Sequence, residues 1–433
     1  MNGGWTHPDR AGTTRRNMKR SLPDFSGLRQ VFAIRNFALY TAGNTLSLTG
    51  MWVQRLAVGW LMWELTESGA WLGAIAIAEF LPIIILTPLG GVVADRFDRL
   101  RVSMIAQGFA CVQATALWLL TLTGHISPEM LVVLMSIGGI TNAMNQAARV
   151  TLVVNMVPRE VMSTAIAISS IIFNVARIIG PAIAGILIAT TDIAWAFFVN
   201  AGSYAALIVA MAMIRMPRLE HRIPPSSSYF RDLVEGARFT FTHTGVAAII
   251  ALTAVNSLFA RPLIDLLPGF AGEVFKGGPQ GLAILTSAMG LGAICASIWL
   301  AQRGRLTGLT NIVFVGVMIN GAAVSVFAMS TNIWTGALLL AVSGFTQACT
   351  GTGTQTLIQS SVTDRLRGRV MSVWLVIGRG GPALGAMVMG TAAEIFSFGP
   401  PLLTGALVTF FAAAYVMPRR TKVARMLERT STD

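Results

Sequence analysis

The chain has 433 residues, of which 54% are hydrophobic and 12% charged, about half the charge that is usual in a soluble domain. This composition excludes an ordinary soluble enzyme or binding domain and predicts an all-α integral membrane protein. The formal net charge of +13 comes from basic residues that recur in alternate loops, which is the positive-inside pattern rather than a nucleic-acid-binding surface.

Apolar runs of about 20 residues, long enough to cross a bilayer core of about 30 Å, recur along the chain and predict twelve transmembrane helices. The expected spans are 36–63, 70–94, 101–123, 129–150, 162–189, 193–214, 245–270, 278–301, 309–328, 333–357, 368–396 and 399–417. An even number of spans places both basic termini on the cytosolic side of the membrane, where anionic lipids are the expected partners.

One long polar interval separates the sixth and seventh spans. It holds Pro224-Pro225 and three serines, followed by a segment, 229–241, whose apolar residues can share one helix face. A flexible linker and an interfacial amphipathic helix are therefore expected. The predicted parts are a cytosolic basic tail at 1–30, an N-terminal six-helix half at 31–215, the cytosolic linker at 216–244, a C-terminal six-helix half at 245–417 and a second cytosolic tail at 418–433.

The two predicted halves share a weak internal repeat. Gly139–Ala143 returns as Gly344–Ala348 at an offset of 205 residues, and Thr41–Asn44 resembles Thr253–Asn256 at an offset of 212. Matches that keep a constant spacing indicate a duplicated unit. The halves are therefore predicted to be pseudo-symmetric.

The stretch Gly90–Arg101, between the second and third spans, holds a glycine pair, two aspartates and three arginines. We expect a tight turn at the water boundary, in which the small residues let the backbone double back and carboxylates accept from arginines. Its Gly-x-x-x-Asp-Arg-x-x-Arg pattern resembles the signature loop of the major facilitator superfamily.

Other stretches are similar to the bacterial branch of that superfamily containing the enterobactin exporter and the transmembrane secretion effectors. They are Trp52–Arg55, Trp60–Thr66, Val93–Arg99, Asn145–Arg149, Val157–Glu160, Phe173–Pro181 and Arg261-Pro262. The resemblance covers nearly the whole chain. It implies halves built from inverted three-helix repeats around a central cavity lined by spans 1, 4, 7 and 10.

In the context of this resemblance, the loop is interpreted as a cytosolic latch that closes the N-terminal half. Its residues are Gly91, Asp95, Arg96, Asp98 and Arg99. Asp95 is expected to cap or bridge to a neighbouring helix through Arg149 or Arg159. The C-terminal half has Gln302 at the corresponding place and lacks the aspartates, so the latch is predicted to be asymmetric.

Charges within spans are costly, so each one is a hypothesis of function. The candidates are Arg55, Glu79, Arg149, Arg177, Arg261, Asp265 and Arg379. The 212-residue offset places Asp265 two residues from Arg55, which predicts opposite charges at similar depth in the two halves. Arg261 and Asp265 share a helix face and can also pair with each other. These groups either contact substrate or form ion pairs that hold a conformation.

The fifth helix of each half carries an arginine at matching depth, Arg177 and Arg379, which either attract an anionic substrate or satisfy carbonyls in a glycine-rich kink. Proton coupling needs a buried acid, because burial raises a carboxylate's pKa. Since no histidine lies deep in a span, Asp265 and Glu79 are the proton candidates. Glu394, near the outer end of span 11, is interpreted as a side chain that reaches water.

Uncharged polar residues form ladders on two spans. Asn142, Gln146 and Arg149 share a face of span 4, and Thr346, Thr350 and Thr354 share a face of span 10 beside Gln347. Asn44 and Asn256 correspond through the repeat. Such residues either contact substrate or join helices through hydrogen bonds.

A small-residue stretch on span 5 contains Gly180, Pro181 and Gly185 and resembles part of an exporter signature. Glycines permit close helix approach and proline permits bending. This stretch is therefore a predicted helix-packing motif.

Several chemistries are excluded by the sequence. No P-loop, zinc-protease or serine-hydrolase motif occurs, and Cys111, Cys295 and Cys349 lie in apolar runs without paired spacing. No enzymatic activity, cofactor, metal or nucleic-acid partner is expected.

The prediction is a monomeric secondary active transporter, a proton-coupled exporter of an amphipathic small molecule such as a siderophore or drug, working by alternating access. The alternatives are an uncoupled uptake facilitator for a metabolite and a lipid-translocating membrane protein.

Overall fold

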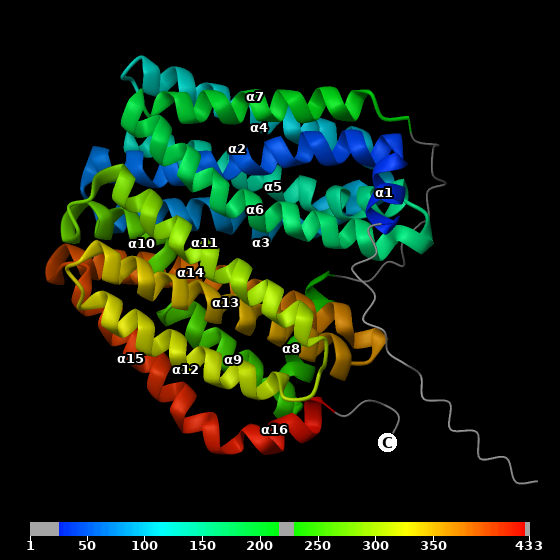
Figure 1. Ribbon diagram of the computed structural model, residues 1–433, viewed down its shortest axis with the longest axis vertical. Helices are drawn as coiled ribbons and strands as arrows, with labels where there is room; N and C mark the ends of the chain where they lie inside the picture. Colours follow the sequence, from blue (N-terminus) through cyan, green and yellow to red (C-terminus); the bar gives the residue numbers. More distant parts are fainter. Residues whose placement is uncertain (1–25, 216–228, 429–433) are drawn as a thin grey trace, which may run out of the picture.

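The computed structural model describes residues 26–215 and 229–428, with the side chains of 88–96 and of a few other residues outside that part. The predicted basic tail before residue 26 and the linker segment 216–228 lie outside it as well. In the described residues the chain is helical nearly throughout (Figure 1).

The helices form two groups, which lie in the upper and lower parts of Figure 1. The N-terminal group contains α1 (Ser26–Ala33), α2 (Arg35–Thr66), α3 (Gly69–Arg96), α4 (Arg99–Leu122), α5 (Pro128–Met156), α6 (Met162–Thr190) and α7 (Ala194–Ala212). The C-terminal group contains α8 (Tyr229–Thr242), α9 (Thr244–Phe259), α10 (Leu263–Gly269), α11 (Gly278–Arg303), α12 (Leu309–Ala328), α13 (Ile333–Ser361), α14 (Asp364–Phe396), α15 (Gly399–Val416) and α16 (Arg420–Leu427).

The boundaries of these helices follow local chemistry. Ser127 caps α5 by accepting from the Met130 amide, and Pro128 occupies the first turn, where its missing N–H costs nothing. Asn332 caps α13 through the amides of Trp334 and Thr335. Capped ends of this kind place the helix limits within a few residues of those expected from the apolar runs.

Ten helical segments in the described residues are long and apolar enough to cross a membrane. Large apolar side chains also face outward, and on α4 the exposed fractions of Ile105, Phe109 and Val112 are 61, 61 and 67%. These three side chains lie on one helical face, a pattern that suits lipid and not water. The protein is therefore a multi-pass membrane protein.

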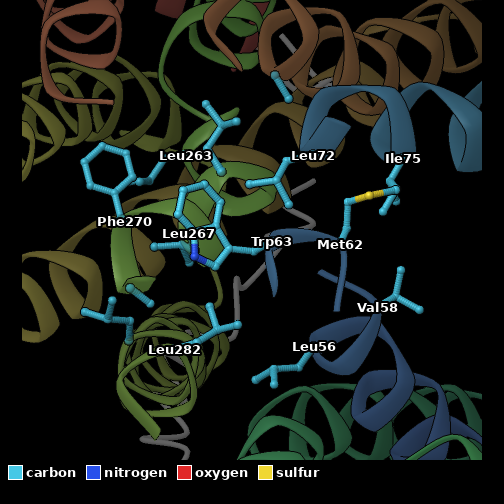
Figure 2. Packing of buried hydrophobic residues seen from close by; sticks show 14 of the residues in the cluster. Leu56, Val58, Met62, Trp63, Leu72, Ile75, Leu263, Leu267, Phe270 and Leu282 are labelled. Carbon is cyan, nitrogen blue, oxygen red and sulfur yellow. The ribbon is translucent and has the colours of Figure 1, made fainter. Parts of the chain in front are cut away.

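The two ends of the helix stack differ in how the groups meet. We call the end that holds α1, α8 and α16 the tail end, and the opposite end the far end (Figure 1). At the far end one hydrophobic core draws residues from both groups, with Leu56, Met62 and Trp63 packed among Leu263, Leu267 and Phe270 (Figure 2). At the tail end each group has its own core.

Three features differ from the sequence prediction. The seventh span is broken at Ala260–Pro262, between α9 and α10, and continues into a π-helical turn at Phe270–Val274. Gly90 and Gly91 lie inside α3, so the turn is not at the glycine pair but at Phe97 and Asp98. The predicted C-terminal tail contains α16, whose Val423 and Leu427 are buried in the C-terminal group's core.

The predicted amphipathic helix is present as α8, which packs on α14. There Glu235 forms an ion pair with Arg369, and the backbone of α14 lies against Gly236. Phe239 joins the tail-end core of the C-terminal group, while Val234 and Phe241 are exposed. The linker helix is thus tied to the C-terminal group.

Candidate functional site: a charged cavity between the helix groups

Two neighbouring cavities lie in the interior of the helix stack. The larger, of about 280 Å³, is lined by residues of α2, α3, α5, α6, α10, α11 and α13, so both groups contribute to its wall. The smaller, of about 110 Å³, lies within the N-terminal group. Arg55, Glu79 and Met135 line both, which makes the two spaces adjacent parts of one polar interior.

An ion pair connects the two helix groups across the larger cavity. Arg55 of α2 donates from Nη2 to Oδ1 of Asp265 on α10 at 3.2 Å. The Arg55 side chain is 44% exposed and that of Asp265 is 17% exposed, because both border the cavity. Trp52, one turn before Arg55, lies with its ring 5.7 Å from the guanidinium carbon. The charges therefore face each other as the 212-residue offset predicts.

The break in the seventh span positions two of the cavity residues. Pro262 has no N–H to donate and its ring disfavours a helical turn just before it, which favours a break at this place. The Arg261 amide accordingly bonds to the Asn256 carbonyl five residues back. Arg261 donates from Nη1 to the carbonyl of Gly378 on α14 at 3.0 Å. Arg261 is thus held by α14, and Asp265 is left to pair with Arg55.

Two other predicted charges line the larger cavity. Glu79 lies on α3 at the boundary of the two cavities, and Arg177 enters from α6. The Nε atom of Arg177 is buried and has no hydrogen-bond partner among the described residues. Gln347 of α13 also lines this cavity, and its amide donates to the Ser343 hydroxyl at 3.0 Å.

The smaller cavity is lined mainly by uncharged polar side chains, together with Arg149 and the shared Arg55 and Glu79. Asn44, Asn142 and Arg149 were predicted from the sequence, whereas Gln54, Gln107, Gln113 and Asn145 were not. Asn200 donates to Gln54 at 2.7 Å, and Gln54 to Gln113 at 3.3 Å, which joins α7, α2 and α4 through buried amides. Glutamine within an apolar run was the available signal for this network.

Three predicted residues line neither cavity: Gln146, Asn256 and Arg379. Asn256 is buried and accepts from the Asn320 amide at 2.8 Å, so it joins α9 to α12. Arg379 is exposed on α14. The threonine ladder of α13 is buried, and Thr346 reaches Asn320 of α12, so this ladder lies at a helix contact.

The small-residue motif of α6 lies at two close helix approaches. A methyl group at Gly180 would meet Cβ of Trp52 on α2 at 2.4 Å, and one at Gly185 would meet Cβ of Ala283 on α11 at 2.3 Å. Pro181 lies inside α6 and lines the larger cavity. The motif therefore brings α6 against both helix groups.

The charged loop after α3 is described only in part. The side chains of Asp95 and Arg96 and the surroundings of Gly91 lie outside the described part of the structure. Asp98 caps α4 by accepting from the Arg101 amide at 3.0 Å, and Arg99 is half-buried. Asp98 thus caps the start of α4, and the contact expected of Asp95 lies outside the described residues.

Glu394 has a role that its sequence position did not indicate. Its Oε1 accepts from the Ser68 hydroxyl at 2.6 Å and from the Ala70 amide at 3.1 Å, at the start of α3. Close by, a methyl group at Gly69 would meet the backbone of Gly390 at 2.7 Å. Glu394 is exposed, as the sequence suggested, and it also joins the two groups at the far end.

Residues 26–432 match the family model described as "Transmembrane secretion effector". The chain belongs to this family. It is thus a transporter of the major facilitator superfamily, and the solved structures that it resembles agree: a peptide transporter POT matches with a TM-score of 0.73 at 11% identity, over 92% of this chain and 99% of that one.

Among curated proteins, this transmembrane secretion effector is 22% identical to the "Staphyloferrin A transporter" of Staphylococcus aureus, over 82% of this chain and 89% of the relative. It is 25% identical to the "Multidrug efflux pump Tap" of Mycolicibacterium fortuitum, over 83% and 88%. It is 26% identical to the "Enterobactin exporter EntS" of Salmonella choleraesuis, over 70% and 72%.

Proposed function

We propose that the protein is a secondary active exporter of an amphipathic small molecule, with siderophores and drugs as the substrate classes. The observation that carries this proposal is the cavity between the helix groups, which combines an ion pair with apolar walls. Such a mixture of few polar groups and many apolar ones suits an amphipathic ligand. The named functions of the relatives, a siderophore transporter, a multidrug efflux pump and a siderophore exporter, point to the same classes.

The proposal includes twelve spans in two pseudo-symmetric halves. In addition to the ten apolar segments, α2 and α5 are counted as spans. They have 32 and 29 residues and are long enough to cross a bilayer. Polar and charged cavity residues lower the hydropathy of these two helices. The halves correspond to the two helix groups, with pseudo-symmetric boundaries near 31–215 and 245–417.

We place the tail end in the cytosol of a bacterium, with the protein in the inner membrane as a monomer. The connections at that end carry Arg99, Arg101, Arg159, Arg303 and Arg305, while those at the far end carry Glu67, His125, Asp192, Glu273 and Lys276. This asymmetry follows the positive-inside rule. Anionic lipids are the partners expected along the basic cytosolic face.

Alternating access is supported by the difference in packing between the two ends of the helix stack. The far end is closed by a core shared between the groups, whereas at the tail end the cores are separate. Rocking the groups about the central cavity would exchange the closed and open ends. Protons couple to this motion through Asp265 and Glu79: protonation of Asp265 removes the charge that holds Arg55, which frees the groups to part.

The test is export into everted vesicles with an acidic interior, with ethidium, enterobactin and staphyloferrin A as the substrate panel. We expect at least one compound to accumulate, and accumulation to stop when the pH gradient is collapsed. Asp265→Asn should abolish the gradient-dependent part. Asp192→Asn is the matched control, because an asparagine keeps the oxygen that caps Ala194. Equal gradient-driven transport by Asp265→Asn would contradict the coupling assignment.

A further inference from the structure

Two arginines of the larger cavity have donors without partners. The Nε atoms of Arg177, on α6, and of Arg261, at the break between α9 and α10, are buried and form no hydrogen bond to the described residues. Both side chains line the same cavity, one from each helix group. A buried guanidinium donor that lacks an acceptor is costly, so a missing acceptor is indicated at this place.

The charges of the cavity wall do not balance. Arg55, Arg177 and Arg261 line the larger cavity together with only two acids, Glu79 and Asp265. Asp265 is already engaged by Arg55 at 3.2 Å. In a membrane interior an excess cation needs a counter-charge. Among the described residues, Glu79 forms no ion pair with Arg177 or Arg261, so neither arginine has a carboxylate partner.

Arg261 is held in place independently of any ligand. Its Nη1 donates to the Gly378 carbonyl at 3.0 Å, and close packing fixes the segment, since a methyl group at Gly385 would meet Cγ of Pro262 at 2.3 Å. One edge of the guanidinium is thus anchored to α14, and Nε remains without an acceptor among the described residues. A pre-positioned arginine of this kind loses little entropy when it binds an anion.

Apart from its charged residues and from Thr286 and Gln347, the wall of the larger cavity is apolar. Trp52, Ile264, Pro268 and Met289 line it, and the volume of about 280 Å³ accepts a molecule of one or two rings. A ligand that fits therefore has an aromatic or aliphatic body and an anionic end.

We propose that the cavity binds the carboxylate or a similar oxyanion of an amphipathic substrate, with Arg177 and Arg261 as its two ligands, one from each helix group. This inference rests on the proposed export function and names the charge of its substrate. Because the ligands come from both groups, the anion also favours the arrangement in which the groups are close together around the cavity. The 205-residue repeat pairs Arg177 with Arg379, but the cavity pairs it with Arg261.

The test is equilibrium binding to the full-length protein in detergent micelles. Radiolabelled 1-naphthylacetate is the probe, and the neutral 1-naphthylacetamide is its matched competitor. We expect the acid to bind about tenfold more tightly than the amide, since a charge-assisted pair is lost in the amide. Equal affinity of acid and amide, or no binding of the acid, would overturn the proposal without any variant.

The variants locate the site. Arg177→Gln and Arg261→Gln should each weaken binding of the acid about tenfold and leave the amide unchanged, whereas Arg177→Lys should retain part of the affinity. Arg305→Gln, in the exposed α11–α12 connection, removes the same charge away from the cavity and should bind as the parent does. Unchanged acid binding by both cavity variants would overturn the assignment.

Further measurements distinguish failure of the anion site from failure of the proposed export function. Displacement of the probe by phosphatidylglycerol as effectively as by unlabelled acid would assign the site to a lipid headgroup and overturn the substrate assignment. Export of 1-naphthylacetate into everted vesicles that is insensitive to Arg177→Gln would keep the export function and overturn the anion site. Acid binding with the predicted variant pattern, but with no export of any panel compound, would support the anion site and defeat the export function.

Discussion

The far end and the tail end of the molecule are built from the same helices but are held together differently. At the far end Trp63 of α2 contacts Phe398 with ring centroids 5.5 Å apart, and Phe398 in turn contacts Phe270 at 5.5 Å, so one core spans both groups. At the tail end Phe37 and Tyr40 belong to one core and Phe314 and Val370 to another. Burial at the far end therefore depends on how the groups are placed, and burial at the tail end does not.

Because of this difference, the stability of each helix group and the opening of the far end can be perturbed separately. Loss of a far-end contact should weaken the arrangement of the groups, while loss of an equally buried tail-end contact should weaken only the fold of one group. Pairs of matched substitutions, one at each end, therefore test whether far-end contacts alone control how the two groups are placed. A common reporter for opening is the rate at which a maleimide labels a cysteine placed at Leu267, which is fully buried in the far-end core.

The largest effect is expected for Trp63→Ala. Truncation of a buried tryptophan costs about 4 kcal/mol, and here the cost falls on the closed far end. We expect labelling of the Leu267 cysteine to rise more than tenfold. Phe37→Ala, which empties a fully buried position in the N-terminal group's tail-end core, should lower the thermal midpoint comparably but leave labelling unchanged. Equal labelling in the two variants would argue against a gate at Trp63.

A smaller effect is expected for Gly73→Leu. A Cβ atom at Gly73 would lie 2.5 Å from Cα of Met387, so a side chain there must push α3 away from α14. Overpacking of this kind destabilises the state with the far end closed by about 2–3 kcal/mol. Transport in vesicles should therefore fall strongly. Gly108→Leu, where nothing lies within 4 Å, is the control and should transport normally.

The smallest effect is expected for Glu394→Gln. This change removes the charge from the bonds to Ser68 and Ala70 and costs about 1 kcal/mol, which corresponds to about a fivefold rise in labelling. Glu428 is a matched acid at the tail end, since it accepts from the Gly308 and Thr310 amides at 2.6 and 2.7 Å within the C-terminal group. Glu428→Gln should lose similar stability without a rise in labelling.

The fold was largely predictable because apolar length dominates a membrane helix. The predicted limits 309–328 and 278–301, for example, correspond to α12 at Leu309–Ala328 and α11 at Gly278–Arg303. The break at Ala260–Pro262 was missed although Pro262 is its physical cause, because the run of apolar residues continues across it. α16 was missed because its stability comes from Val423 and Leu427 packing on a distant core.

Charged residues of the site could be predicted because a charge inside a membrane span is costly by itself. The role of a residue was harder to predict where it depends on the partner that the residue contacts. Arg55 and Asp265 could be matched through the repeat, and their ion pair lies where the repeat places it. The partners of Arg177 and Arg379 depend on helix rotation, which apolar periodicity leaves undetermined in a helix surrounded by lipid and protein. The same limit hid Glu394, whose acceptor role arises only when the end of α14 meets the start of α3.

Opening of the far end during transport is tested most directly by cross-linking the two helix groups there. Ser68→Cys and Glu394→Cys are introduced together in a variant in which Cys111, Cys295 and Cys349 are replaced by alanine, and the pair is joined by a short bis-methanethiosulfonate cross-linker. We expect that the cross-linked protein does not export and that a reducing agent restores export, with each single-cysteine variant unaffected by the reagent. Export by the cross-linked protein at the rate of the reduced protein would contradict the claim that the far end opens during transport.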